Sequence, residues 1–245
     1  MKNKKLNQAF KNNKKTFEWA GYKWEGCMEG GRIISPSLPW YWLDKEQVLI
    51  DESSSEKPIY LYLTEKNNTV KHWDGNTYYP TQACGAIRSV NSFSYGTFSM
   101  DIKAPKGYNL WPSFWLSGDE NWPPEIDIFE AWTYENNYFV WTQTRFPWLN
   151  PGWKTTNNIH YNNNNIEHTH IGSNNISIFK QWHNPTEVFV NYKVDWFPDE
   201  IIFYVNNKVV RKVKNEVCHQ LVNNLNHPDK SFKMDVIINV WCENP

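Results

Sequence analysis

The feature that most constrains the fold is a series of short segments in which apolar and polar residues alternate. Three segments each place apolar side chains on one face, namely residues 97–104, 187–196 and 234–241. A period of two is typical of half-buried β-strands. Only residues 215–224 carry a weak helical pattern. Many strands without alternating helices predict an all-β sandwich or barrel and argue against a βαβ fold.

Turn signals separate further strands. Asn206-Asn207 divides the apolar runs 201–205 and 209–213, and Asn tolerates the positive φ angles of a tight hairpin. Asp74-Gly75 is a second turn signal, and residues 59–63 form another short β-type run. We therefore expect antiparallel hairpins along much of the chain.

Composition narrows the class of protein. The 245 residues fit one large domain, and 17% aromatic residues, including 15 Trp, can bury a large core. The net charge of -1 gives no bulk attraction to nucleic acid, and no apolar run approaches the length of a membrane span. We expect a monomer with neither nucleic acid nor membrane as a partner.

The N-terminal segment differs from the rest. Residues 1–15 hold six Lys and no acidic residue, and they lack the apolar stretch of a secretory signal. We expect residues 1–16 to be a flexible Lys/Asn-rich segment and residues 17–245 to be a single domain. The sequence assigns no cellular location.

The four cysteines form no CxxC pair. They allow three disulfide pairings, among which the sequence does not choose. In a chain that is not exported, buried thiols are expected at these positions, which are Cys27, Cys84, Cys218 and Cys242.

Three carboxylates lie within six residues of an otherwise apolar strand, in the segment WPPEIDIFE. In a regular strand Glu125 and Asp127 share a face and Glu130 points the other way. A β-bulge between Asp127 and Glu130 would return Glu130 to the first face, while Ile126 and Ile128 anchor the opposite one. Neighbouring buried carboxylates are costly, so this arrangement favours a functional role.

A pair of carboxylates on one face suits glycoside hydrolysis with retention. One attacks the anomeric carbon and the other protonates the leaving oxygen, at a separation of roughly 5–5.5 Å. Like-charge coupling pushes the two pKa values apart, as this division of roles needs. The alternative is an exposed acidic edge strand that resists aggregation, and the spacing alone leaves both interpretations open.

Segments on both sides of the carboxylate motif add to the pattern. In chain order they are Gly85–Ser89, Phe93–Phe98, Leu110–Leu116, Tyr192–Trp196 and Ile238–Trp241. With the bulged E-x-D-x-x-E pattern among them, the sequence resembles glycoside hydrolase family 16, which contains laminarinases, lichenases, agarases and carrageenases. The resemblance extends from about Phe17 to Trp241.

The resemblance implies a β-jelly-roll sandwich of two antiparallel sheets, concanavalin A-like, with a concave sugar-binding cleft. It implies that Glu125 is the nucleophile, that Glu130 is the acid/base and that Asp127 assists the nucleophile. No cofactor is needed for such chemistry, although members often bind one structural calcium ion on the convex side. The ligands of that ion cannot be placed from this sequence.

Several residues are candidates for sugar binding. The resemblance implies that role for Arg88, Trp111, Asn239 and Trp241. Trp122 and Trp132 bracket the carboxylates, but core packing is an equal alternative for both, and we expect Trp115 to be core. His160 follows the catalytic strand as in some members. A metal site at His168 and His170 is not favoured, because no Glu follows at the spacing of the cupin motif.

The C-terminal region departs from the family pattern. Members usually continue to a final strand with a D-[YW]-[VI]-x-[VW]-like pattern, which is missing before Pro245. We expect an open sheet edge there, or one that the N-terminal segment fills.

These observations predict an endo-acting, retaining hydrolase of a β-linked polysaccharide, either a β-1,3- or mixed-linkage glucan or a galactan. The first alternative is a non-catalytic carbohydrate-binding or receptor-binding module on the same fold. The second is a transglycosylase, because the same intermediate can react with a sugar instead of water.

Overall fold

The computed structural model describes most of the chain. Its described residues are 5–11, 14–27, 41–72, 74–107, 110–118, 124–131, 153–160, 177–181, 184–214 and 234–242. Strands make up nearly all of the regular structure in these ranges, and no α-helix occurs within them. The prediction of an all-β, predominantly antiparallel fold is therefore confirmed. The chain forms two compact units, Ser92–Val236 and Met1–Asn91 with Ile237–Pro245.

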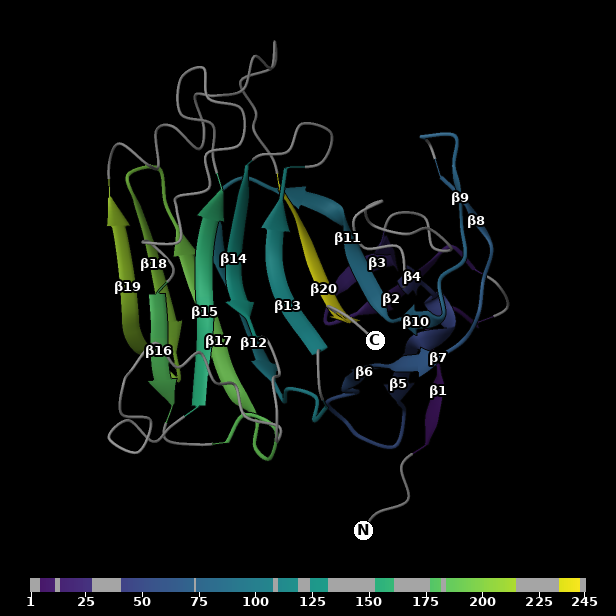
Figure 1. The fold of residues 1–245 in the computed structure, drawn as a ribbon. Helices are drawn as coiled ribbons and strands as arrows, with labels where there is room; N and C mark the ends of the chain where they lie inside the picture. Colours follow the sequence, from purple (N-terminus) through teal and green to yellow (C-terminus); the bar gives the residue numbers. More distant parts are fainter. Residues whose placement is uncertain are drawn as a thin grey trace, which may run out of the picture. The chain divides into compact units, whose positions relative to one another are not determined.

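The unit Ser92–Val236 contains two layers of antiparallel strands (Figure 1). One layer has the order β16-β15-β14-β13, with bounds Ser177–Gln181, Trp153–His160, Glu125–Glu130 and Leu110–Ser117. The other has the order β12-β17-β18-β19, with bounds Gly96–Ile102, Val190–Trp196, Glu200–Val205 and Lys208–Lys214. β14 contacts β17 and β16 contacts β19, so the two layers form a sandwich.

The core of this sandwich follows from the period-two pattern. β17 buries every second side chain from Val190 to Trp196, as the alternation predicts. The aromatic rings of Phe129 on β14 and Tyr192 on β17 lie 4.3 Å apart between centroids, so the two layers interlock there. Val188 is 42% exposed and precedes the strand, so its predicted place on the buried face is wrong.

The predicted hairpin between β18 and β19 is confirmed. Asn206 and Asn207 connect the two strands with φ angles of 47° and 63°. Positive φ at both central residues twists a two-residue turn in the same sense as the flanking strands. The turn at Asp74-Gly75 is also present, between β8 (Val70–Lys71) and β9 (Thr77–Tyr78), with Gly75 at φ 88°.

The other unit contains three groups of strands and the β8–β9 pair. One group has the order β20-β11-β3-β2, with bounds Met234–Cys242, Ala86–Phe93, Tyr22–Gly26 and Thr16–Trp19. The boundary between the two units lies within β20, and Ile237 is the first β20 residue of this unit. A second has the order β4-β10-β7, with bounds Tyr41–Leu43, Gln82–Cys84 and Leu63–Glu65. A third has the order β1-β5-β6, with bounds Leu6–Gln8, Val48–Asp51 and Ile59–Leu61. The pair β4–β10 is parallel, unlike the antiparallel pairs around it.

Two expectations for this unit need correction. Leu6–Gln8 pairs with β5, so the segment 1–16 contains a strand and is not a flexible tail throughout. The run 59–63 is divided at Tyr62 into β6 and β7, because β6 pairs with β5 whereas β7 pairs with β10. The single domain expected for residues 17–245 stays a prediction.

Some sequence-based expectations lie beyond what the structure describes. The weak helical pattern at 215–224 and the residues Cys218, His168 and His170 are outside the described residues. Cys27 and Cys84 are buried thiols, as expected.

Within the described ranges, no helix is long and apolar enough to cross a membrane.

The β18–β19 turn gives a test of the fold. Asn207→Val should lower the free energy of unfolding by about 1–2 kcal/mol, because a β-branched residue is strained at positive φ. Asn207→Gly should leave it equal or slightly higher. Urea unfolding of both variants measures the difference, and equal stability of the two would contradict the turn geometry.

Candidate active site

The site is organised by a β-bulge in β14. Against β13, Asp127 pairs with Trp115 and Phe129 pairs with Phe114, so Ile128 is the extra residue on β14. Against β15, the register shifts between Asp127 and Glu130. An inserted residue reverses the alternation beyond it, so Glu130 returns to the face of Glu125 and Asp127. The predicted bulge is confirmed.

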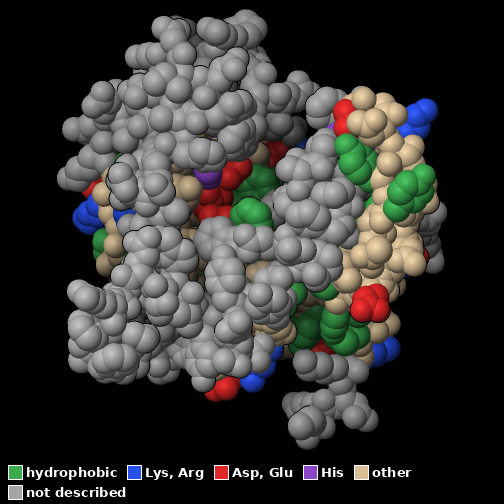
Figure 2. Space-filling view, viewed as in Figure 1, with side chains coloured by type: hydrophobic (Ala, Val, Ile, Leu, Met, Phe, Trp, Pro, Cys, Tyr) green, Lys and Arg blue, Asp and Glu red, His purple; other side chains and the backbone are tan. Residues whose placement is uncertain are grey.

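The register builds three rows on one face of the sheet, because directly opposite residues in an antiparallel pair point to the same side. From β13 through β14 to β15, the rows are Ser117–Glu125–His160, Trp115–Asp127–Asn158 and Ser113–Glu130–Thr156. Figure 2 shows acidic side chains, with a histidine beside them, gathered over β13 and β14. Trp115 is buried as expected, but it lies on the carboxylate face and not on the face toward the second layer.

The opposite face of β14 holds the strand in the sandwich. Ile126 and Phe129 are fully buried, and Ile128 is almost so. The packing of Phe129 against Tyr192 fixes which side of the strand faces the second layer. The apolar side of β14 therefore sets the direction of its carboxylates, as the sequence predicts for Ile126 and Ile128.

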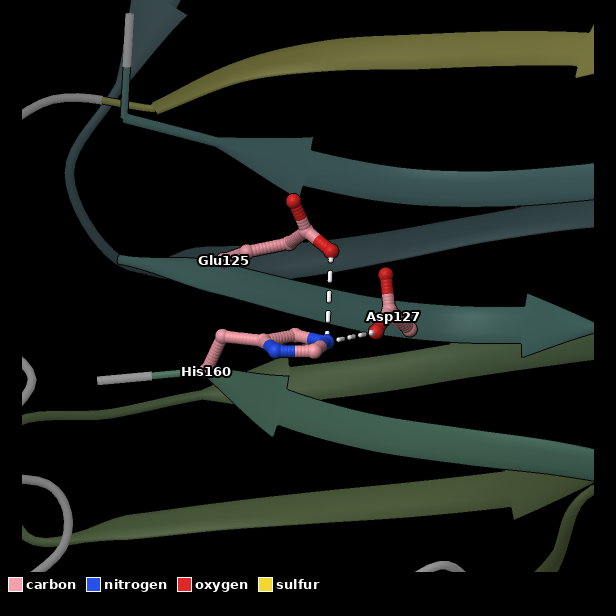
Figure 3. Close-up of side chains that lie close together, drawn as sticks. All are labelled: Glu125, Asp127 and His160. Carbon is pink, nitrogen blue, oxygen red and sulfur yellow. Dashed lines mark hydrogen bonds and ion pairs between the residues drawn. The ribbon is translucent and has the colours of Figure 1, made fainter. Parts of the chain in front are cut away.

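The carboxylates of Glu125 and Asp127 converge on one nitrogen atom of His160 (Figure 3). The Nε2 atom of His160 lies 3.1 Å from Oδ2 of Asp127 and 3.4 Å from Oε1 of Glu125. Asp127 also shares a side-chain hydrogen bond with Glu125. His160, predicted as a sugar-binding residue, is thus in direct contact with two of the predicted catalytic carboxylates.

Glu130 has its own donor. The indole Nε1 of Trp111 on β13 donates a hydrogen bond of 2.9 Å to Oε1 of Glu130. The Thr156 hydroxyl on β15 donates to the backbone carbonyl of Glu130 at 3.3 Å. Glu130 is 8% exposed. The predicted sugar-binding Trp111 therefore orients the predicted acid/base.

Burial controls the protonation of the site. Burial raises the pKa of Asp127 well above its usual value, a charge on Glu130 adds to the effect, and the hydrogen bond with Glu125 opposes it. Burial, with the charge of Glu125, raises the pKa of Glu130 to about 8, against the opposing effect of the Trp111 hydrogen bond. Burial lowers the pKa of His160, and the charge of Glu125 opposes this. These shifts favour a protonated Glu130 and an uncharged His160 at neutral pH.

The same cluster has the residue types of a cation site. Glu125, Asp127 and His160 offer ligand atoms that all lie within 4.8 Å of one another. Their contacts have the distances of hydrogen bonds and ion pairs made directly between the side chains, so we do not assign them as metal ligands.

The remaining residues that the sequence predicts to bind sugar belong to other parts of the chain. Arg88 on β11 donates to Oε1 of Glu25 through Nε at 3.2 Å and Nη2 at 3.0 Å. Asn239 on β20 is buried. Trp122, Trp132 and the side chain of Trp241 are outside the described residues. The sugar-binding roles of all five stay predictions.

Sequence reasoning missed the polar residues that flank the carboxylates, namely Ser113, Ser117, Thr156 and Asn158. Their place follows from strand register, which the sequence does not encode locally. One signal was present: Asn158 lies two residues before His160 and therefore on the same face of a strand.

Comparison with known proteins agrees with this geometry. The chain belongs to the glycosyl hydrolases family 16, whose family model matches residues 44–244. Its fold is the β-jelly-roll of that family, as the solved structures that it resembles indicate.

Individual relatives are distant. Endo-1,3-1,4-beta-glycanase EglC of Rhizobium meliloti is 25% identical over 52% of this chain and 23% of its own length. Xyloglucan endotransglucosylase/hydrolase protein 3 of Arabidopsis thaliana is 28% identical over 62% of this chain and 43% of its own. The chain thus matches less than half the length of either relative. The kappa-carrageenase from Pseudoalteromonas carrageenovora, solved with an oligotetrasaccharide of kappa-carrageenan, shares the fold. It superposes with a TM-score of 0.62 at 14% identity, over 100% of this chain and 84% of that one.

The raised pKa of Glu130 predicts a pH-dependent cost of folding. Between its usual value near 4.5 and about 8, the folded state binds more protons than the unfolded state, so this group makes stability fall as pH rises. Glu130→Gln should therefore raise the free energy of unfolding relative to wild type by on the order of 4 kcal/mol more at pH 8 than at pH 4.5.

Urea unfolding at the two pH values measures this difference. Glu187→Gln is the matched control, because Glu187 is an exposed residue of the same unit. A pH-independent effect of Glu130→Gln, equal to that of the control, would refute the burial argument.

Proposed function

We propose that this chain is an endo-acting, retaining glycoside hydrolase of β-linked polysaccharides that works by double displacement. The observation that carries the proposal is the β14 bulge, which puts Glu125, Asp127 and Glu130 on one face of the sheet. Membership of the glycosyl hydrolases family 16 supports the class of reaction.

In the first step, a carboxylate oxygen of Glu125 attacks the anomeric carbon and forms a glycosyl ester. The bond from that carbon to the glycosidic oxygen breaks, and Glu130 gives its proton to the departing oxygen. The raised pKa of Glu130 keeps this proton available at neutral pH. The Trp111 N–H holds the carboxyl in place during the transfer.

In the second step, the ionised Glu130 takes a proton from water as the water oxygen attacks the same carbon. The ester bond to Glu125 breaks, and two inversions give net retention. Asp127 assists by holding the Glu125 carboxylate through their shared hydrogen bond. The reaction as written needs no cofactor, and a structural calcium ion on the convex side is proposed from the resemblance alone.

The proposed substrate is a β-1,3- or mixed-linkage glucan, or a galactan. The relationship to an endo-1,3-1,4-beta-glycanase supports the glucan. Linkage choice depends on loops, and carboxylate geometry does not fix it. We propose that the enzyme acts as a monomer, with the polysaccharide as its partner and neither nucleic acid nor membrane involved.

Transglycosylation is a second candidate, favoured by the relationship to a xyloglucan endotransglucosylase/hydrolase. The glycosyl ester on Glu125 is common to both reactions, and only the acceptor differs. Chromatography of the products separates them, because transfer gives chains longer than the substrate whereas hydrolysis gives only shorter ones.

The primary experiment is reducing-sugar release from laminarin, mixed-linkage β-glucan, xyloglucan, agarose and carrageenan. Wild type should cleave one of them internally, seen as an early fall in chain length. Glu125→Gln should lose at least about 10³-fold in rate while it remains folded, because no nucleophile is left. Full activity of this variant would remove Glu125 from its role, and release of only terminal sugars would refute endo action.

Azide distinguishes the two glutamates. In Glu125→Ala, azide replaces the nucleophile in one displacement and should give a glycosyl azide of inverted configuration. In Glu130→Ala, azide attacks the glycosyl ester without needing a base and should give the retained azide. Glu187→Gln should yield no azide product and keep wild-type activity. The reverse pair of configurations would exchange the roles of Glu125 and Glu130.

A further inference from the structure

Asn158 and His160 on β15 lie on the carboxylate face, yet neither takes part in the steps above. Both side chains are largely buried. The amide of Asn158 has a fixed orientation, because its Oδ1 accepts the backbone N–H of Ile159 at 2.9 Å. Its Nδ2 therefore faces Nε2 of His160, at 3.1 Å.

This contact constrains the imidazole. An amide nitrogen only donates hydrogen bonds, so Nε2 of His160 must accept with its lone pair. In that state the ring is neutral and its proton is on Nδ1. The same Nε2 lies beside Asp127 and Glu125, whose carboxylate oxygens would favour a proton on it. The Asn158 amide therefore favours an unprotonated Nε2, whereas the two carboxylates favour a protonated one.

The surroundings of His160 favour the state in which Nε2 is unprotonated. Two titratable groups that contact His160 are Glu125 and Asp127, both on β14. Burial lowers the pKa of His160, which disfavours an imidazolium ion. Burial raises the pKa of Asp127, so its carboxyl can keep a proton instead of passing it to His160.

We propose that Asn158 and His160 are a pair of positioning residues, in which Asn158 keeps Nε2 of His160 unprotonated and so leaves the proton on Asp127. This inference rests on the proposed function. Glu125 then faces a neutral ring and a neutral acid, and it keeps its full negative charge for the anomeric carbon. Without the amide donor, Nε2 takes up a proton, and the imidazolium pairs with Glu125 and weakens it as a nucleophile.

The test replaces the donor by an acceptor of nearly the same size. Asn158→Asp should place a proton on Nε2 of His160, visible in long-range ¹H–¹⁵N spectra that distinguish protonated from unprotonated ring nitrogens. The spectrum of His160→Asn assigns the signal. In wild type at pH 7, the proposal requires an unprotonated Nε2.

Activity gives the second readout. The acid limb of the kcat/KM profile of Asn158→Asp should move up by about one pH unit, because the imidazolium now sets the lower limit. At the wild-type optimum, kcat/KM should fall about 10- to 100-fold. Asn206→Asp adds the same charge in the exposed β18–β19 turn and should change neither readout.

The outcomes separate this inference from the proposed function. A protonated Nε2 in wild type, or an unprotonated one in Asn158→Asp, overturns the inference whatever the activity. A tautomer change without a shift of the acid limb also overturns it, because the ring would then not act on Glu125. If wild type cleaves no polymer while the spectra are as expected, the proposed function fails and the proton placement stands.

Discussion

The site depends on one inserted residue in β14. Ile128 has no separate partner on β13, and this single extra position brings Glu130 to the face of Glu125 and Asp127. In a regular strand, Glu130 would point toward the layer where Phe129 meets Tyr192. A carboxyl group there would be buried among apolar side chains, whereas on the observed face it accepts a hydrogen bond from Trp111. The bulge thus determines both the stability of the strand and its chemistry.

Burying three carboxylates together is unfavourable, and the rest of the sandwich compensates for it. Ile126 and Phe129 hold β14 against the second layer, and hydrophobic burial on that side offsets the electrostatic cost on the other. In the proposed mechanism this cost has a chemical use. It keeps Glu130 protonated at neutral pH, and a protonated acid beside an ionised nucleophile is the state that retaining hydrolysis needs.

Much of this could be predicted from the sequence, because the relevant patterns are local. Period-two alternation identifies β17, and the spacing of Glu125, Asp127 and Glu130 requires a bulge if all three share a face. Register between distant strands is different. β15 is a polar strand, WKTTNNIH, whose sequence does not say which residue lies opposite Asp127. The contacts of Asn158, and the placing of Trp115 on the carboxylate face, therefore emerge only from the structure.

The most direct test of the account is to trap the glycosyl ester. A 2-deoxy-2-fluoro glycosyl fluoride, built on the sugar of the cleaved polymer, forms the ester quickly and releases it slowly. Peptide mapping by mass spectrometry then locates the added sugar. The account predicts one sugar per chain, attached to Glu125. Attachment to Asp127 or Glu130, or rapid turnover of the polymer with no trapped ester, would contradict it.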